Sequence, residues 1–230
     1  MPRRAGGLGS VYGQEQAGRV SVTAHRSAGQ RIGISREDVI RQAAELADRE
    51  GVAAVTLARL ALVNNVRTPT ISHHVISLAQ LRADIAVLAV EELAEALQLA
   101  ATGKTGVDAV RAMYRAYRSY VHNFPGRYTA SVETPDPRDE RRLAAAGRLA
   151  RHLVDVFGQI GLGGEDAMRA ARLLRSAVHG YATLELKSAW QMPLDNDATF
   201  DWLLDVIING LLGAKEKSTS RKRSLPSTNA

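Results

Sequence analysis

The sequence predicts an all-α fold in which a small N-terminal helix-turn-helix unit precedes a larger helical part. Apolar residues recur at helical spacing along most of the chain from Ile34 to Leu212, and no useful stretch alternates with a period of two. Almost every Pro and many Gly lie at the seams between these segments. We therefore expect successive helices whose boundaries fall at those seams.

The first helix is expected to begin after Ser35, because Ser followed by acidic residues is typical of an N-cap. Gly51 is expected to end it. Its buried face should then consist of Val39, Ile40, Ala43, Leu46 and Ala47.

Two short helices and a tight turn are expected next. Thr56 is placed to cap a helix from Leu57 to about Val63, and Asn64-Asn65 to take the left-handed turn that Gly usually supplies. Thr68 is expected to cap a helix from Pro69 to about His74, because Pro at the first helical position loses only an unpartnered donor. In a helix-turn-helix arrangement this last helix is the one that enters a DNA major groove.

The remaining helices are expected to be longer. Ser77 is a plausible cap for a helix that joins the first unit to the rest, with an apolar stripe at Leu81, Ile85, Leu88, Leu93 and Leu97. Further helices are expected from Val107 to about Asn123, from the loop at 134–137 to about Gly161, from Glu165 to about Trp190 and from Ala198 to about Leu212. Breaks are expected at 101–106, 124–126 and 161–164.

Composition limits the class of protein. The chain has 230 residues, 45% hydrophobic and 23% charged, which is ordinary for a soluble globular protein. No apolar run approaches the roughly 18–20 residues that cross a bilayer, and the N-terminus lacks the apolar core of a secretory signal, so we expect a cytoplasmic protein without a membrane partner. The absence of Cys excludes disulfides, thiolate metal sites and Cys nucleophiles.

The net charge of +6 is concentrated at the two ends of the chain. Residues 1–33 hold five Arg against one Glu, and residues 215–230 hold five basic residues against one Glu, so the part between them is slightly acidic. We expect a basic, disordered arm over 1–33 and a basic, flexible tail over 214–230. For the arm two interpretations stand: it adds salt-dependent affinity for DNA, or it is only a solvated segment.

Several motifs resemble those of TetR-type one-component transcriptional regulators. The run Asp48-Arg49-Glu50-Gly51-Val52, followed by Val55-Thr56-Leu57, Leu60-Ala61, Val66-Arg67-Thr68-Pro69 and His74-Val75, resembles their DNA-binding domain. Ala177-Val178-His179-Gly180-Tyr181 with Leu184-Glu185-Leu186 is similar to the His-Gly core of a C-terminal domain in one branch, and Phe124-Pro125-Gly126-Arg127-Tyr128 to its helix-connecting turn. Together these motifs span roughly residues 34 to 212.

Departures from the family pattern fall where the family touches DNA. Asn65 replaces the usual Gly of the turn, Asn64 the usual Leu, Leu62 and Val63 commonly polar residues, and Ser72 the usual Tyr. An unpaired buried amide at Asn64 is expected to cost about 1–3 kcal/mol. Ser72 lacks the phenol that the family typically directs at a phosphate. DNA binding with altered specificity or lower affinity is therefore expected.

The resemblance implies a domain at 34–80 that binds DNA and a domain at 81–213 that binds an effector and dimerises. It implies a ligand-responsive regulator, usually a repressor, on a palindromic operator. The alternative is a dimeric small-molecule-binding protein of the same fold with a weakened or lost DNA-reading head. The residues expected to contact DNA are Thr56, Arg59, Arg67, Thr68, Thr70, Ser72, His73 and His74. For His74, a role in fixing its helix is an equal alternative.

The last two helices carry apolar stripes that need a partner. The resemblance implies a homodimer through a four-helix bundle, with an interface at Leu173, Leu174, Leu184, Phe200, Leu203, Leu204, Ile207, Ile208 and Leu211. The alternative is that both stripes are buried within one subunit.

Candidates for an effector pocket are apolar side chains with a few polar tips: Met113, Tyr117, Tyr120, Phe157, His179, Tyr181, Trp190 and Met192. The alternative is that they form the core, and that His179 beside Gly180 marks close helix packing. Because no charged residue is clearly directed inward, we expect a lipophilic or aromatic effector.

Nothing in the sequence indicates an enzyme. There is no phosphate loop, dinucleotide fingerprint, HExxH run or nucleophile elbow, and the six His lack metal-ligand spacing, so we expect neither catalysis nor a metal or cofactor. Asp139-Glu140 is more simply the first turn of a helix.

Overall fold

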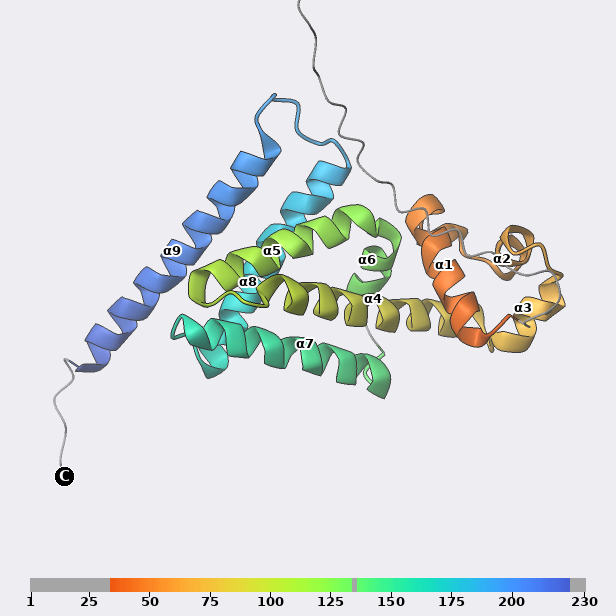
Figure 1. Ribbon diagram of the computed structural model, residues 1–230, viewed down its shortest axis with the longest axis horizontal. Coiled ribbons are helices and arrows are strands. Elements are labelled where there is room, and N and C mark those ends of the chain that lie inside the picture. The colour runs from red at the N-terminus through yellow and green to blue at the C-terminus, as the bar shows by residue number, and fades with distance from the viewer. Residues whose placement is uncertain (1–33, 134–135, 224–230) are drawn as a thin grey trace, which may run out of the picture. The chain divides into compact units, whose positions relative to one another are not determined.

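The computed structural model describes residues 34–133 and 136–223, and this part of the chain is helical with short connections and no strand (Figure 1). The all-α prediction is confirmed. In chain order the helices are α1 (Arg36–Glu50), the 3₁₀ turn η1 (Val52–Ala54), α2 (Leu57–Val63), α3 (Thr68–His74), α4 (Leu78–Ala101), α5 (Gly106–Asn123), α6 (Pro125–Val132), α7 (Glu140–Gln159), α8 (Gly164–Leu186) and α9 (Asn196–Arg223). None of these helices has the length and apolar character that a membrane crossing requires.

The N-terminal capping predictions are confirmed at α1 and α2. Ser35 and Asp38 form a capping box, because the Ser35 hydroxyl accepts from the Asp38 N–H at 3.0 Å and the Asp38 carboxylate from the Ser35 N–H at 3.1 Å. Gly51, at φ +87°, ends α1. Thr56 caps α2 by accepting from the Arg59 N–H at 3.1 Å.

The cap predicted for α3 is wrong by one residue. Arg67 occupies the N-cap, with no side-chain hydrogen bond to the helix, and Thr68 is the first helical residue. Pro69 therefore stands at the second helical position, which it tolerates because that N–H also lacks a partner within the helix.

Three later predictions need correction. The turn predicted at 124–126 continues directly into α6. The helix predicted to reach Trp190 ends at Leu186, because Ser188 takes a left-handed conformation and Trp190 folds back onto Tyr181, with ring centroids 4.5 Å apart. The last helix runs on to Arg223, so residues 214–223 are helical where a flexible tail was expected. The expected arm at 1–33 and the tail end at 224–230 lie outside the described residues.

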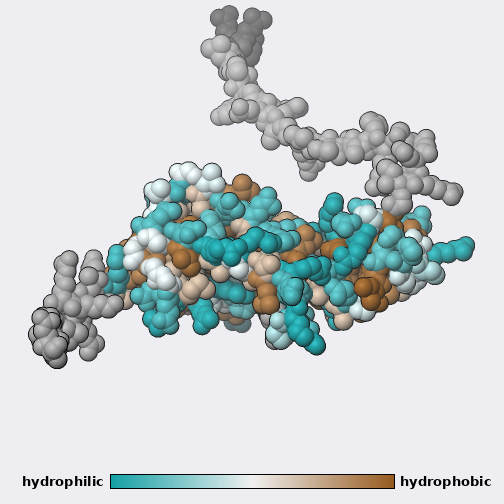
Figure 2. Space-filling model, turned by 90° about the horizontal axis from the view of Figure 1, so that it is seen from below, coloured by the Kyte–Doolittle hydropathy of each residue, from teal (hydrophilic) through white to brown (hydrophobic). Residues whose placement is uncertain are grey.

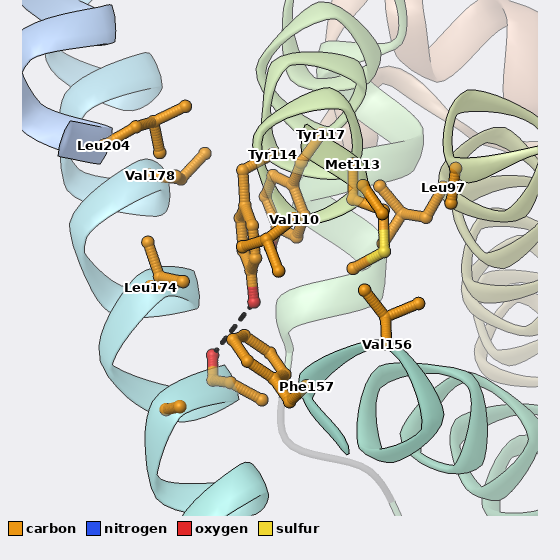
Figure 3. Packing of buried hydrophobic residues seen from close by; sticks show 14 of the residues in the cluster. Leu97, Val110, Met113, Tyr114, Tyr117, Val156, Phe157, Leu174, Val178 and Leu204 are labelled. Carbon is orange, nitrogen blue, oxygen red and sulfur yellow. Dashed lines mark hydrogen bonds between the residues drawn. The ribbon is translucent and has the colours of Figure 1, made fainter. Parts of the chain in front are cut away.

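Two buried clusters organise the described chain. The first joins α1–α3, which we call the head, to the beginning of α4, and it also takes in Ala130 of α6. The second lies within the body, α4 to α9, where Tyr114 and Met113 of α5 and Phe157 of α7 are fully enclosed (Figure 3). Because α4 contributes to both clusters, it joins the head to the body (Figure 1).

Helix α6 packs unusually close to α1. A Cβ on Gly126 would lie 2.1 Å from the carbonyl of Ala47, so only Gly fits there. The contact is continued by charge, since the Arg127 guanidinium lies 2.9 Å from the Asp48 carboxylate of α1 and 3.1 Å from the Glu92 carboxylate of α4. Head and body are thus joined through a backbone contact as well as through α4.

Candidate nucleic-acid interface and effector cavity

The turn between α2 and α3 is fully formed without glycine. Asn65 adopts φ +52°, as predicted, and the Val66 N–H donates to the Ala61 carbonyl at 3.0 Å. The expectation of an unpaired amide at Asn64 is wrong: its side chain is half-buried and donates to the Leu60 carbonyl at 2.8 Å. The departures in the turn therefore leave its geometry intact.

Helix α3 presents one outer face held by a single inner anchor. Ile71 is fully buried against the head cluster, whereas Thr68, Thr70, Ser72 and His73 are exposed. The Ser72 hydroxyl donates to the Thr68 carbonyl at 3.2 Å, which ties this short side chain to its own helix. An exposed helix face with one buried anchor has the geometry of an element that enters a groove.

His74 is half-buried, unlike the other candidates on α3. Its ring meets that of His73 edge-on, with centroids 5.3 Å apart. This placement suits the alternative in which His74 helps to fix α3.

Two arginines predicted to contact DNA differ in their surroundings. Arg59 is held by Glu50 of α1 through two hydrogen bonds, at 3.0 and 2.6 Å, and this pairing raises the pKa of Arg59 and lowers that of Glu50. Arg67 is exposed beside α3 and has no ion-pair partner within the described residues. Arg67 is therefore the guanidinium of this surface that is free to meet a ligand.

The surface next to α3 also contains apolar side chains. Leu62 is 69% exposed and Ile76 is 92% exposed, and Val63 is exposed beside them. Figure 2 shows such apolar surface among hydrophilic side chains at the end of the molecule where Figure 1 places the head. The surface around α3 thus carries more hydroxyl, imidazole and apolar groups than charged groups.

A central cavity of about 390 Å³ lies within the body. Its walls come from α4, α5, α7 and α8, with the end of α6 at one side. Most of the lining is apolar or aromatic and includes Leu93, Leu97, Tyr114, Tyr117, Leu149 and Leu153. Three arginines, Arg142, Arg172 and Arg175, line it, and Glu133 is the one acid among the described residues of the lining. This size and composition are those of a small-molecule site.

The predicted effector residues do not converge on one place. Tyr117 lines the central cavity, while Met113 and Phe157 are fully buried in the core (Figure 3). Tyr181, Trp190 and Met192 border a different hollow of about 410 Å³, beside the loop that precedes α9. Tyr120 lies elsewhere, with its hydroxyl donating to the Ala89 carbonyl at 3.1 Å.

His179 reaches the cavity only through a chain of hydroxyls. Its Nδ1 lies 2.5 Å from the Tyr128 hydroxyl, which lies 3.1 Å from the hydroxyl of Tyr117. Burial raises the pKa of Tyr128 well above its ordinary value, so this hydroxyl keeps its proton. The prediction of close helix packing at Gly180 is wrong within the subunit, because a Cβ added there would meet no described atom within 4 Å.

Several cavity residues escaped sequence reasoning. Tyr114 was not among the candidates although it lies one helical turn before Tyr117, and its hydroxyl donates to the Ala171 carbonyl at 3.5 Å (Figure 3). Arg172 and Arg175 were missed although they stand three residues apart beside an apolar stripe, a spacing that places them on one helix face.

Most of the apolar residues predicted to form the dimer interface are buried within the subunit. Leu174, Phe200, Leu204 and Ile208 are fully buried within the subunit, so the structure assigns these four to the core. Leu203, Ile207 and Leu211 are partly buried and pack against the same core, whereas Leu173 and Leu184 are exposed. For most of the α9 stripe, the alternative of burial within one subunit describes the structure.

A different face of α8 and α9 remains open. Trp202, 68% exposed, and Val206 lie four residues apart on α9, on the side that the sequence analysis did not consider. Gly180 on α8 and Gly210 on α9 have open space where a Cβ would stand. On α9, Val206 stands one helical turn before Gly210, and exposed apolar side chains near such a glycine form a surface that another helix can approach closely.

Charged contacts tie the head to the wall of the cavity. Asp84 of α4 is almost fully buried and lies 2.5 Å from both Arg36 of α1 and Arg141 of α7. The next residue, Arg142, lines the cavity and donates to the carbonyls of Ser131 and Glu133 at 2.8 and 2.6 Å. The first turn of α7 therefore contacts the cavity on one side and the head, through Asp84, on the other.

Comparison with known proteins places this architecture in a family. Residues 110–207 match the family model described as the Tetracyclin repressor-like, C-terminal domain. The HTH-type transcriptional regulator Rv0681 of Mycobacterium tuberculosis is 32% identical over 211 residues, covering 91% of this chain and 93% of that protein. The chain belongs to the TetR family of helix-turn-helix transcriptional regulators. The regulator YobS of Bacillus subtilis is 30% identical over 183 residues, 79% of this chain and 95% of that protein.

Solved structures of TetR-type regulators share the fold. A possible TetR family transcriptional regulator from Streptomyces coelicolor A3(2) is 20% identical, with a TM-score of 0.61 over 78% of this chain and all of that one. BioQ with its double-stranded DNA operator is 19% identical, with a TM-score of 0.51 over 77% of this chain and 98% of that one. ActR of Streptomyces coelicolor in complex with (S)-DNPA is 18% identical, with a TM-score of 0.56 over 79% and 98%.

Proposed function

We propose that this TetR-family regulator is a ligand-responsive repressor that binds a palindromic operator as a homodimer. The observation that carries the proposal is the outer face of α3. Thr68, Thr70 and His73 are exposed on this helix, while Ile71 is buried and holds the helix in place. A recognition helix needs such a face, because its side chains must reach base edges while the helix itself stays fixed.

The proposed contacts divide by chemistry. Hydroxyl and imidazole groups at Thr70 and His73 suit the donors and acceptors of base edges, whereas Thr56, Thr68 and Ser72 suit phosphate oxygens. Arg67, exposed and without an ion-pair partner within the described residues, suits either a guanine or a phosphate. Arg59 is placed to support α2 through Glu50, and His74 to support α3.

The alternative function, a dimeric ligand-binding protein with a lost head, rested on Asn64, Asn65 and Ser72. Asn64 is hydrogen-bonded and Asn65 takes the conformation that the turn requires, so Ser72 is the remaining argument for it. The intact turn favours the regulator that binds DNA.

A homodimer is proposed through the open face of α8 and α9 that contains Leu173, Leu184, Trp202 and Val206. Exposed aromatic and aliphatic side chains are typical anchors of such interfaces. A twofold dimer presents two α3 helices, and half-sites about 34–36 Å apart match successive major grooves. Proteins of related fold have been solved with operator DNA, in the case of BioQ, and with (S)-DNPA, in the case of ActR.

Effector binding is proposed to act through the first turn of α7. A ligand in the central cavity that displaces Arg142 also moves its neighbour Arg141, which holds Asp84 together with Arg36 of the head. The spacing of the two heads then changes, and operator affinity falls. We further propose that the protein has no catalytic activity and works in the cytoplasm, where a transcriptional regulator meets its operator.

The test is footprinting of the DNA upstream of the gene with nonspecific competitor across a salt series. We expect a protected palindrome with half-sites one helical turn apart. A double variant, Thr70→Ala with His73→Ala, should lose the footprint, whereas Thr102→Ala, exposed after α4, should keep it. Sequence-blind binding that vanishes at moderate salt contradicts the proposal and favours the protein with a lost head.

A further inference from the structure

The central cavity has an apolar interior and a cationic side. Apolar and aromatic side chains form most of its wall, among them leucines from α4 and α7 and the rings of Tyr114 and Tyr117. Arg142, Arg172 and Arg175 also line it, and Glu133 is the one acid among the described residues of the lining. With three guanidinium groups against one carboxylate, the cavity carries excess positive charge.

These arginines differ from those of α5 in lacking a carboxylate partner. Each arginine of α5 is paired: Arg111 with Asp205 at 2.6 Å, Arg115 with Asp201 at 2.8 Å and Arg118 with Glu185 at 2.5 Å. No ion pair joins Arg142, Arg172 or Arg175 to an acid within the described part of the chain. The Arg142 guanidinium donates to the carbonyl oxygens of Ser131 and Glu133. Arg172 and Arg175 are exposed, so an anion from solution can reach their guanidinium groups.

The charge of Arg175 affects the pKa values of other groups that line the cavity. Burial lowers the pKa of Arg142, the nearby carboxylates of Asp139 and Glu133 oppose that change, and the charge of Arg175 adds to it. Burial raises the pKa of Tyr114, and Arg175 opposes that change. Arg175 thus lies near enough to both side chains for its field to reach them. An anion bound between the arginines relieves their mutual repulsion.

We propose that the central cavity binds an amphipathic acid, whose apolar body packs among the leucines and tyrosines and whose carboxylate pairs with Arg142, Arg172 and Arg175. This inference names the effector class for the ligand-responsive regulator proposed above and rests on that function. It keeps the lipophilic body expected from the sequence and adds an anionic end, because guanidinium groups bind carboxylates by short, charge-assisted hydrogen bonds.

The test measures binding to the full-length protein by calorimetry, without DNA. Two matched probe series are used: decanoate, decanol and decylammonium, and 2-naphthylacetate with the corresponding alcohol and ammonium compounds. We expect at least one acid to bind at least about tenfold more tightly than its alcohol, and the matched cation not to bind. The proposal is overturned if neither acid binds, or if an alcohol or cation binds as tightly as its acid.

Substitution of the cavity arginines tests which of them bind the carboxylate of the ligand. Arg172→Gln with Arg175→Gln should weaken binding of the acid by about 10- to 100-fold and leave the alcohol unchanged. Arg169→Gln is the matched control, since Arg169 lies on the same helix but pairs with Glu165 and Asp166. An unchanged affinity for the acid in a double variant with a normal circular dichroism spectrum and thermal midpoint contradicts the assignment.

The proposed repressor function and the proposed effector class can be refuted independently. A protein that protects its palindrome but binds neither acid refutes the effector class and leaves the repressor standing. A protein that binds an acid but protects no operator refutes the proposed repressor and leaves the cavity's ligand class standing.

Discussion

Individual side chains in the head decide how the DNA-binding surface is charged. Glu50 engages Arg59 through both of its oxygens, so one of the two arginines next to the recognition helix is held within the protein. Arg67 stands exposed at the start of α3 and has no such partner among the described residues. The sequence alone does not distinguish the two, because it does not show that Glu50 of α1 lies against Arg59.

Replacing Arg67 by Ala should weaken specific operator binding by about 1–3 kcal/mol. If Arg67 contacts a guanine, specificity changes at that base alone, and if it contacts a phosphate, affinity falls evenly across sequences and the salt dependence decreases. Mobility-shift titrations on the mapped operator and its single-base variants measure both effects.

Arg59→Ala is the matched control, because its guanidinium is already engaged by Glu50. It should reduce operator affinity less than Arg67→Ala. The reverse order of the two effects would contradict the assignment of Arg67.

In the body, Glu185 joins three helices. Its carboxylate accepts from Arg118 of α5 at 2.5 and 2.8 Å and lies 2.8 Å from His122 Nε2, while Arg118 also reaches Asp197 of α9 at 2.7 Å. The hydrogen bonds from Arg118, and then that from His122, hold the pKa of Glu185 below its ordinary value. The carboxylate is therefore bound more strongly in its charged form.

Glu185→Gln should lower the free energy of unfolding by about 1–3 kcal/mol at pH 7. Because the folded pKa is depressed, this stabilisation is present above the unfolded pKa of about 4.3 and is lost as the pH falls through the folded value. The difference between the two proteins should therefore shrink towards zero at about pH 3. Urea unfolding at one protein concentration over a pH series measures it.

The control for this change is Glu165→Gln on the same helix. Glu165 is 79% exposed in its pair with Arg169, so its loss should change the free energy of unfolding by less than about 0.5 kcal/mol. A pH-independent deficit in Glu185→Gln would argue against the charge-based explanation.

At the scale of whole helices, α1 of the head and α6 of the body meet in a close backbone contact. Gly126 permits it, and the paired charges of Asp48, Arg127 and Glu92 surround it. Burial raises the pKa of Asp48 against the opposing effect of its hydrogen bond from the Arg127 N–H. Close packing therefore contributes more to this contact than the ion pair does.

Gly126→Ala should lower the free energy of unfolding by about 1–3 kcal/mol, because a Cβ would overlap backbone atoms of Ala47 that have no alternative position. Gly158→Ala in α7 is the control, since nothing lies within 4 Å of its added Cβ and Ala favours a helix. Chemical denaturation of both variants gives the comparison. Equal stability of the two variants would contradict the close contact.

For the whole molecule, the exposed face of α8 and α9 carries the proposed assembly. Trp202→Glu with Val206→Glu should raise the dimer dissociation constant at least about 100-fold, because a charge would be buried without a partner. Sedimentation equilibrium measures this change, with circular dichroism to confirm that the subunit stays folded.

Leu99→Glu serves as the control, because Leu99 is 66% exposed on α4, away from that face. It should leave the dissociation constant unchanged. A double variant that remains as dimeric as the parent protein would move the interface elsewhere.

Local sequence signals determined the helices other than α6 and, within one to three residues, most of their N-terminal boundaries. Ser35, Thr56 and Ser77 cap α1, α2 and α4 as predicted, since capping depends on a few neighbouring residues. Asn65 took the left-handed conformation for the same local reason. The helix-turn-helix, the all-α class and the family could therefore be predicted from the chain alone.

Only the tertiary structure decided which face of each helix is free. Periodicity shows that Phe200, Leu204 and Ile208 share a face, but not that α5 and α8 already cover it, leaving Trp202 and Val206 outside. The grouping of Arg142, Arg172 and Arg175 around one cavity likewise depends on the packing of α7 against α8. Such contacts join residues distant in sequence, and helical spacing carries no information about which neighbour a face will meet.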